Sequence, residues 1–113
     1  MSAATYDTTI EQGATWTRTI TWQTGSTPSP VNLTGYTARM SLKGPSLPVF
    51  SLTTENGRIT LGGSAGTVTL LISAADTAGM SPVDYKYDLE LVTGSVVFRL
   101  LEGVLSVSEN ITT

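Results

Sequence analysis

The feature that most constrains this chain is a C-terminal run in which apolar and charged side chains alternate. Between residues 85 and 92, Tyr85, Tyr87 and Leu89 fall on one side, whereas lysine, aspartate and glutamate fall on the other. A period of two with opposite chemistry on its two sides is typical of a half-buried strand in an antiparallel sheet. Thr93-Gly94 follows where a tight turn is expected, and residues 95–107 form a further apolar run. We therefore predict that the chain ends in a β-hairpin.

The same period of two recurs along most of the chain. Residues 14–23 place two tryptophans, an arginine and an isoleucine on one side and a row of threonines on the other. Shorter strand-like runs, bounded by glycine, proline or asparagine, follow at residues 36–43, 50–54, 58–61 and 67–72. The pattern predicts an all-β fold, an antiparallel β-sandwich of seven to eight short strands.

One segment indicates a helix. Ser73 can cap its start, Asp76 lies three residues further on, and Gly79 can end it in a left-handed conformation. Pro82 prevents a longer helix. We therefore predict a single short helical turn near residues 73–79.

The length of 113 residues suits one domain with one core. We expect residues 13–113 to form a single β-sandwich domain and residues 1–12 to form a flexible N-terminal arm. The start of the chain lacks the basic and apolar regions of a signal peptide, and the apolar runs are too short to cross a bilayer. We expect a soluble protein that is made in the cytoplasm and has no membrane partner.

The composition argues against several classes of function. The chain has no cysteine and no histidine, the residues most used as nucleophile, general base and metal ligand. Its six basic residues are scattered, the net charge is −3, and no basic stripe suggests nucleic-acid binding. The densest acids, Asp76, Asp84, Asp88 and Glu90, lack the spacing of a calcium loop. We predict no catalytic, metal or cofactor site, and therefore no enzyme.

Two groups of side chains are expected to carry the fold and its contacts. The predicted core anchors are Trp16, Ile20, Trp22, Tyr36, Met40, Tyr85, Tyr87 and Leu89. The predicted docking surface comprises Tyr6, Thr15, Thr17, Arg18, Thr19 and Thr21. The tryptophans could instead stack on a ligand, but Ile20 shares their side and favours a core role. Arg18 is expected at a sheet margin, where its stem can lie on apolar surface.

Two resemblances extend this interpretation. The segment from Asp76 to Tyr85 looks like the corner between strands E and F of immunoglobulin-like sandwiches. Five segments also occur in an order similar to that of small tailed-phage virion proteins whose immunoglobulin-like domain resembles the N-terminal domain of phage upper baseplate proteins. The segments are Val31–Met40, Gly57–Leu61, Leu71–Ala78, Tyr87–Leu91 and Arg99–Ser108.

The second resemblance implies an immunoglobulin-like sandwich that serves as a virion structural protein, made in the host cytoplasm. Such a module would dock on the tail, baseplate or head surface by contacts with other virion proteins, as a trimer or hexamer. Because the sequence ends at Thr113 without a further receptor-side region, we expect a stand-alone adaptor. Two alternatives stay open. One is a carbohydrate-binding β-sandwich module that attaches to host-surface glycans, and the other is a capsid decoration (cement) protein.

Overall fold

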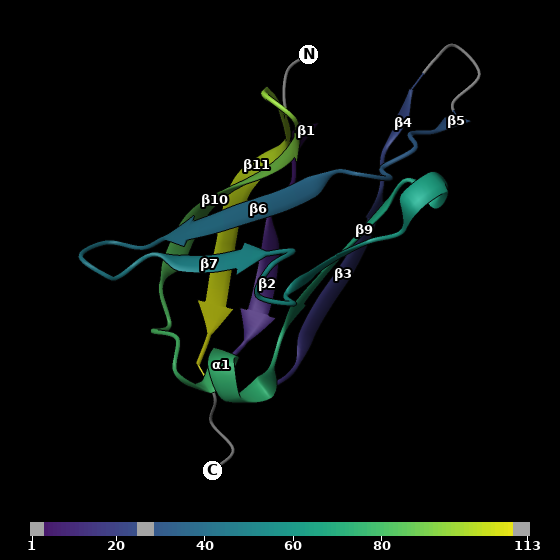
Figure 1. Ribbon diagram of the computed structural model, residues 1–113. Helices are drawn as coiled ribbons and strands as arrows, with labels where there is room; N and C mark the ends of the chain where they lie inside the picture. The colour runs from purple at the N-terminus through teal and green to yellow at the C-terminus, as the bar shows by residue number, and fades with distance from the viewer. Residues whose placement is uncertain (1–3, 25–28, 110–113) are drawn as a thin grey trace.

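The computed structural model describes residues 4–24 and 29–109, which form an all-β sandwich (Figure 1). The larger sheet has the strand order β1-β11-β10-β6-β7, and β2 also pairs with β11. Its strands are β1 (Ala4–Thr5), β2 (Thr8–Glu11), β6 (Thr37–Lys43), β7 (Phe50–Thr53), β10 (Asp84–Thr93) and β11 (Val96–Ser108). The predicted β-sandwich is confirmed.

The second sheet of the sandwich has three strands in the order β3-β9-β8. These are β3 (Trp16–Thr21), β8 (Ile59–Leu61) and β9 (Thr67–Ile72). A separate two-stranded ribbon, β4 (Gln23–Thr24) with β5 (Ser29–Pro30), extends beyond β3 (Figure 1). There are more described strands than the seven to eight expected, because β1, β4 and β5 are only two residues long and β2 was not predicted.

The core lies between the two sheets and is built from the inward side chains of the alternating strands. On β10, Leu89 and Leu91 are fully buried, and they lie opposite Met40 and Ala38 of β6. From the three-stranded sheet, Val68, Leu70 and Ile72 of β9 are also buried. The alternation predicted from the sequence therefore sets which side of each strand faces the core.

The predicted C-terminal hairpin forms, but its turn lies one residue later than the expected Thr93-Gly94, and the pairing has one irregularity. Thr93 pairs with Val96, so the turn consists of Gly94 and Ser95, and Gly94 adopts the left-handed φ of 57°. Leu89 pairs with Leu101 but Glu90 pairs with Arg99, which leaves Leu100 as the extra residue of a β-bulge. The bulge turns the consecutive residues Leu100 and Leu101 both toward buried positions.

The predicted helical turn is α1 (Ala74–Ala78), at the end of the sandwich in Figure 1. The Ser73 hydroxyl accepts a hydrogen bond from the Asp76 N–H at 3.2 Å, as a capping residue should. The expectation for Gly79 was wrong, because its φ of −86° is right-handed. Its N–H bonds the Asp76 carbonyl, so the helix ends in a tightened turn that needs no left-handed residue.

The connection from α1 into β10 is held by a tyrosine near the start of that strand. Tyr85, near the start of β10, is buried, and its hydroxyl accepts a hydrogen bond from the N–H of Ser81 at 3.2 Å. A tyrosine that bonds the backbone a few residues upstream is typical of the corner before strand F in immunoglobulin-like sandwiches. This bond fixes the chain where it crosses from the three-stranded sheet to the larger one.

The N-terminal segment differs from the expected flexible arm. Residues 4–5 and 8–11 pair in parallel with β11, and Ile10 is fully buried. The approach is close at Gly103, where an added Cβ would collide with the Tyr6 carbonyl oxygen. These parallel pairs make the larger sheet mixed, whereas an antiparallel sandwich was expected. The pairing was not predicted because segments so distant in the sequence are not joined by a hairpin turn. Residues 1–3 lie outside the described residues.

Candidate docking surface

The outer side of the three-stranded sheet carries a continuous set of uncharged side chains, here called the threonine face. Directly opposed residues share one side of a sheet. Between β3 and β9, the register pairs Thr17 with Leu71, Thr19 with Thr69 and Thr21 with Thr67. Between β8 and β9, it pairs Thr60 with Thr69. The threonine face consists of Thr17, Thr19, Thr21, Thr60, Thr67, Thr69 and Leu71. It joins three strands that are separated in the sequence.

The side chains of the threonine face are available to a partner. The β3 threonines and Thr60 are exposed, and Leu71 shows 42% of its surface although it is a large aliphatic residue. Thr19 and Thr69 exchange a hydrogen bond between their hydroxyls at 3.2 Å, which orders the centre of the face. The face therefore offers uncharged hydroxyl groups, with the apolar side chain of Leu71 beside Thr17 at one end.

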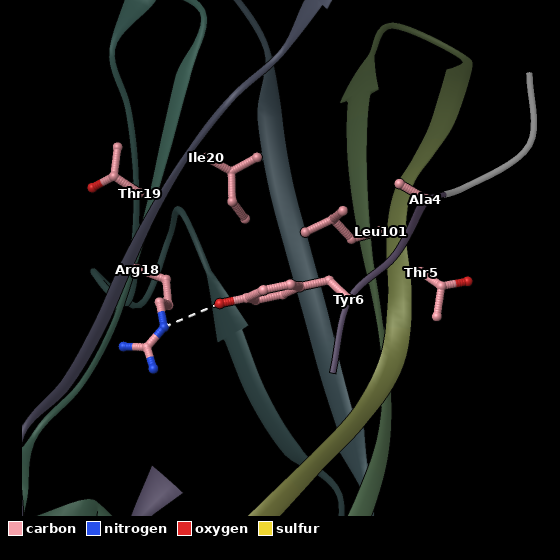
Figure 2. A pocket seen from close by; sticks show the side chains of 7 residues that line it. All are labelled: Ala4, Thr5, Tyr6, Arg18, Thr19, Ile20 and Leu101. Carbon is pink, nitrogen blue, oxygen red and sulfur yellow. Dashed lines mark hydrogen bonds between the residues drawn. The ribbon is translucent and has the colours of Figure 1, made fainter. Parts of the chain in front are cut away.

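Three residues of the predicted docking surface, Tyr6, Thr15 and Arg18, lie elsewhere, at the margin between the sheets. Arg18 shares the inner side of β3 with Trp16 and Ile20, and its guanidinium lies 5.3 Å from the Trp16 ring centre. The Arg18 Nε donates a hydrogen bond to the Tyr6 hydroxyl at 3.2 Å (Figure 2). Its Nη2 donates to the hydroxyl of Thr8, also at 3.2 Å. Arg18 therefore connects β3 to the N-terminal strands of the larger sheet.

This margin contains two hollows separated by Arg18. The first, here called the slot, has a volume of about 400 Å³ and is lined by Ala4, Thr5, Tyr6, Arg18, Thr19, Ile20 and Leu101. In Figure 2, Ile20 and Leu101 point toward one another across the slot, above the Tyr6–Arg18 hydrogen bond. The second hollow lies on the other side of Arg18, where Glu11 and Thr15 take part in its lining. Thr15 thus lies at the margin, just before β3.

The two tyrosines near the margin have shifted pKa values with opposite directions. Hydrogen bonds from Arg18 and Thr8 stabilise the phenolate of Tyr6 and lower its pKa. Burial raises the pKa of Tyr87 to about 12, with a further contribution from nearby Tyr6 and Asp7. The Tyr87 hydroxyl donates a hydrogen bond to the Tyr6 carbonyl, which requires the neutral phenol. Tyr87 therefore fastens the N-terminal segment to β10.

The outer side of the larger sheet has the opposite chemistry. Four of the chain's six basic side chains lie on it, namely Arg39, Lys43, Lys86 and Arg99. Arg39 contacts Glu90 at 2.8 Å, and Arg99 contacts Glu90 at 3.7 Å and Asp88 at 3.5 Å. These ion pairs connect the side chains of the three adjacent strands β6, β10 and β11. We call this side the charged face.

The predicted core anchors occupy the interior or its rim. Trp16, Trp22, Met40, Tyr85, Tyr87 and Leu89 are buried. Ile20 and Tyr36 are half-buried and pack against the core. The rings of Trp22 and Tyr36 meet edge to face at 6.4 Å, and Phe98 lies 5.3 Å from Trp22. The tryptophan rings are thus engaged with other side chains of the chain.

The sequence alone identified only part of this surface. It indicated the threonines of β3, but it gave no sign that Thr60, Thr67, Thr69 and Leu71 would join them. The alternation within residues 67–72 was visible, whereas the strand order that brings β9 beside β3 depends on packing between distant segments. The contact of Arg18 with Tyr6 and Thr8 was hidden for the same reason, because residues 1–12 were expected to be free.

Comparisons with known proteins leave the family of this chain open. No family model matches the sequence, and no curated protein matches it. Within residues 4–24 and 29–109, the acids form no group of three or more that could hold a metal ion. In the same part of the chain, no helix has the length and apolar character needed to cross a membrane.

Proposed function

We propose that this protein is a non-enzymatic docking module that assembles with other proteins through the threonine face. One observation carries the proposal, the composition of that face, which combines six threonines with the exposed Leu71. Hydroxyl groups can exchange hydrogen bonds with a partner at a smaller desolvation cost than charged groups. The apolar side chain of Leu71, at one end of the face, adds contact area whose burial removes apolar surface from water.

The sequence resemblance supports a narrower version of this role, a structural protein of a tailed-phage virion. Its partners would be other virion proteins of the tail, baseplate or head surface, and its copies would form a trimer or hexamer. Repetition around a symmetric particle allows many weak contacts to act together. A capsid decoration protein would perform the same docking at the head surface.

The carbohydrate-binding alternative has less support. Sugar stacking requires exposed aromatic rings, but Trp16, Trp22 and Tyr85 are 4%, 7% and 4% exposed, and Tyr36 is half-buried against Trp22. The rings that suggested this alternative therefore do not form an exposed platform.

Light scattering coupled to size-exclusion chromatography, over a wide concentration series, tests the proposal. We expect wild-type protein to form a trimer or hexamer that Leu71→Lys dissociates, because the substitution places a charge in the contact. Val97→Lys is the matched control, since Val97 is an exposed aliphatic residue on the larger sheet, 46% exposed against 42% for Leu71. This variant should leave the oligomer intact.

Two results would contradict the proposal. One is an oligomer that Leu71→Lys leaves unchanged and Val97→Lys dissociates, which would move the contact to the other sheet. The other is a monomer at every concentration that binds on a glycan array, which would replace docking by carbohydrate recognition.

A further inference from the structure

The edge of β3 next to the slot has backbone groups directed away from its own sheet. Within the described residues, β3 pairs with β9 alone. The Leu71 N–H donates to the Arg58 carbonyl, so Leu71 points its backbone groups toward β8, and its neighbour Leu70 points them toward β3. Leu70 lies opposite Arg18. It follows that Arg18 and Ile20 bond β9, whereas Thr17, Thr19 and Thr21 direct their N–H and C=O groups outward.

Arg18 covers one end of this edge. Its Nη1 donates a hydrogen bond to the Thr17 carbonyl at 2.8 Å, which places that carbonyl on the outward side, as the alternation requires. Arg18 also reaches Tyr6 and Thr8, so the margin is closed at this point. Natural edge strands are often protected by charged side chains in this manner. The stretch from Thr19 to Thr21 lies beyond that cover.

The slot lies beside this uncovered stretch. Thr19 and Ile20 line one wall, and Leu101 and Ala4 contribute apolar groups from the larger sheet (Figure 2). A strand that bonded the Thr19 and Thr21 backbone would alternate its own side chains between the threonine face and the interior side. The interior side is where the slot lies, and its volume of about 400 Å³ accommodates an aliphatic side chain.

We propose that the open edge of β3 and the slot bind an extended segment of another protein by strand addition. The segment adds to the three-stranded sheet beside Thr19 and Thr21 and inserts one aliphatic side chain between Ile20 and Leu101. This inference rests on the proposed docking function and names the chemistry of its partner. It extends the threonine face by one strand rather than covering it.

A second copy of β3 does not fit the slot. The inward side chains of β3 include the buried Trp16 and the half-buried Ile20, which pack in the core of their own molecule. They cannot enter the slot of a neighbour without leaving that core. A segment that is extended and not otherwise packed has its side chains free, and it therefore suits the site.

The test is an NMR titration of uniformly ¹⁵N-labelled full-length protein with the peptide acetyl-Thr-Val-Thr-Val-Thr-amide. We expect the largest amide shifts at Thr19, Thr21 and Leu101. Thr19→Pro removes one outward donor, and edge strands tolerate proline where the N–H faces solvent. It should weaken binding about tenfold, as expected for one lost hydrogen bond of about 1.4 kcal/mol. Thr19→Val retains the N–H and should change the affinity less than about twofold.

A second measurement needs no protein variant and covers the case in which Thr19→Pro misfolds. The same peptide with the nitrogens of all five residues methylated keeps its side chains but loses the backbone donors of its threonines and its valines, so it should produce no shifts in β3 whichever way the strand runs. The proposal is overturned if neither peptide shifts β3, if both peptides bind equally, or if Thr19→Pro and Thr19→Val bind alike while both are folded.

The outcome separates this inference from the proposed function. If Leu71→Lys dissociates the oligomer but the peptide does not shift β3, strand addition is wrong and docking through the face stands. If the peptide binds the edge while Leu71→Lys leaves assembly unchanged, the face is not the contact and the strand-addition site stands on its own.

Discussion

The two outer sides of the sandwich differ in the chemistry of their side chains. On the charged face, Arg39, Arg99, Asp88 and Glu90 satisfy one another across three adjacent strands. On the threonine face, the side chains carry no charge, and the strand at its margin has backbone groups directed outward. A partner that covered the first face would have to disrupt or desolvate ion pairs. Covering the second costs less, so the difference indicates which side is suited to contact.

The largest expected effect tests whether both faces depend on one core. Leu89 is fully buried on β10, the central strand of the larger sheet. Leu89→Ala should lower the free energy of unfolding by about 2–5 kcal/mol, because it removes buried hydrocarbon and leaves a cavity. Urea unfolding followed by tryptophan fluorescence and by far-UV circular dichroism measures this. Separate transitions for the two probes would show that the sheets unfold independently.

The next prediction contrasts a threonine that holds the fold with one that faces outward. Thr77 is fully buried, its hydroxyl donates to the Ala14 carbonyl at 2.8 Å, and it accepts from the Gly13 N–H at 3.1 Å. Thr77→Val should cost about 1–3 kcal/mol, since it leaves buried backbone groups unpaired. Thr60→Val on the threonine face is the control and should change stability by less than about 0.5 kcal/mol. Equal losses in thermal unfolding would contradict the distinction between the two threonines.

The third prediction concerns alkaline pH and the N-terminal segment. Because the folded-state pKa of Tyr87 is raised to about 12 from the ordinary value of 10.0, its neutral form stabilises the fold. This contribution is complete below pH 10 and is lost as the pH rises toward 12. Tyr6, with a lowered pKa, acts in the opposite direction and gains stability as it ionises. Absorbance titration should show a tyrosine that ionises near pH 12, which we assign to Tyr87.

Tyr87→Phe separates these two contributions. The variant should lose the step near pH 12, and its stability should no longer fall between pH 10 and 12 on account of this residue. An unchanged step near pH 12 in the variant would mean that another tyrosine has the raised pKa.

The smallest expected effect lies on the charged face. Arg39 pairs with Glu90 at 2.8 Å, but its side chain is 56% exposed, so solvent and salt screen the interaction. Arg39→Ala should lower stability by no more than about 1 kcal/mol, and the difference should shrink at high salt. Chemical unfolding at low and high ionic strength measures it. A larger, salt-independent loss would mean that Arg39 contributes through packing.

The local pattern of the sequence was sufficient for most of the fold. The alternation in residues 85–92 and the capping residue Ser73 predicted β10 and α1, because both depend on neighbours within a few positions. The pairing of residues 4–11 with β11 was missed because it joins segments about a hundred positions apart. The hydrogen bond from the Val104 N–H to the Asp7 carboxylate is one example. The same limit applies to the candidate surface. The sequence indicated the threonines of β3, but the strand order alone adds Thr69 and Leu71.

The central claim is that β3 has an open edge beside the threonine face, and native-state amide hydrogen exchange tests it residue by residue. Arg18 and Ile20 should exchange slowly because their N–H groups bond β9, whereas Thr17, Thr19 and Thr21 should exchange much faster. Such alternation along a single strand is the predicted result. Uniformly slow exchange of all five amides would contradict it, because it would mean that a further strand already covers the edge.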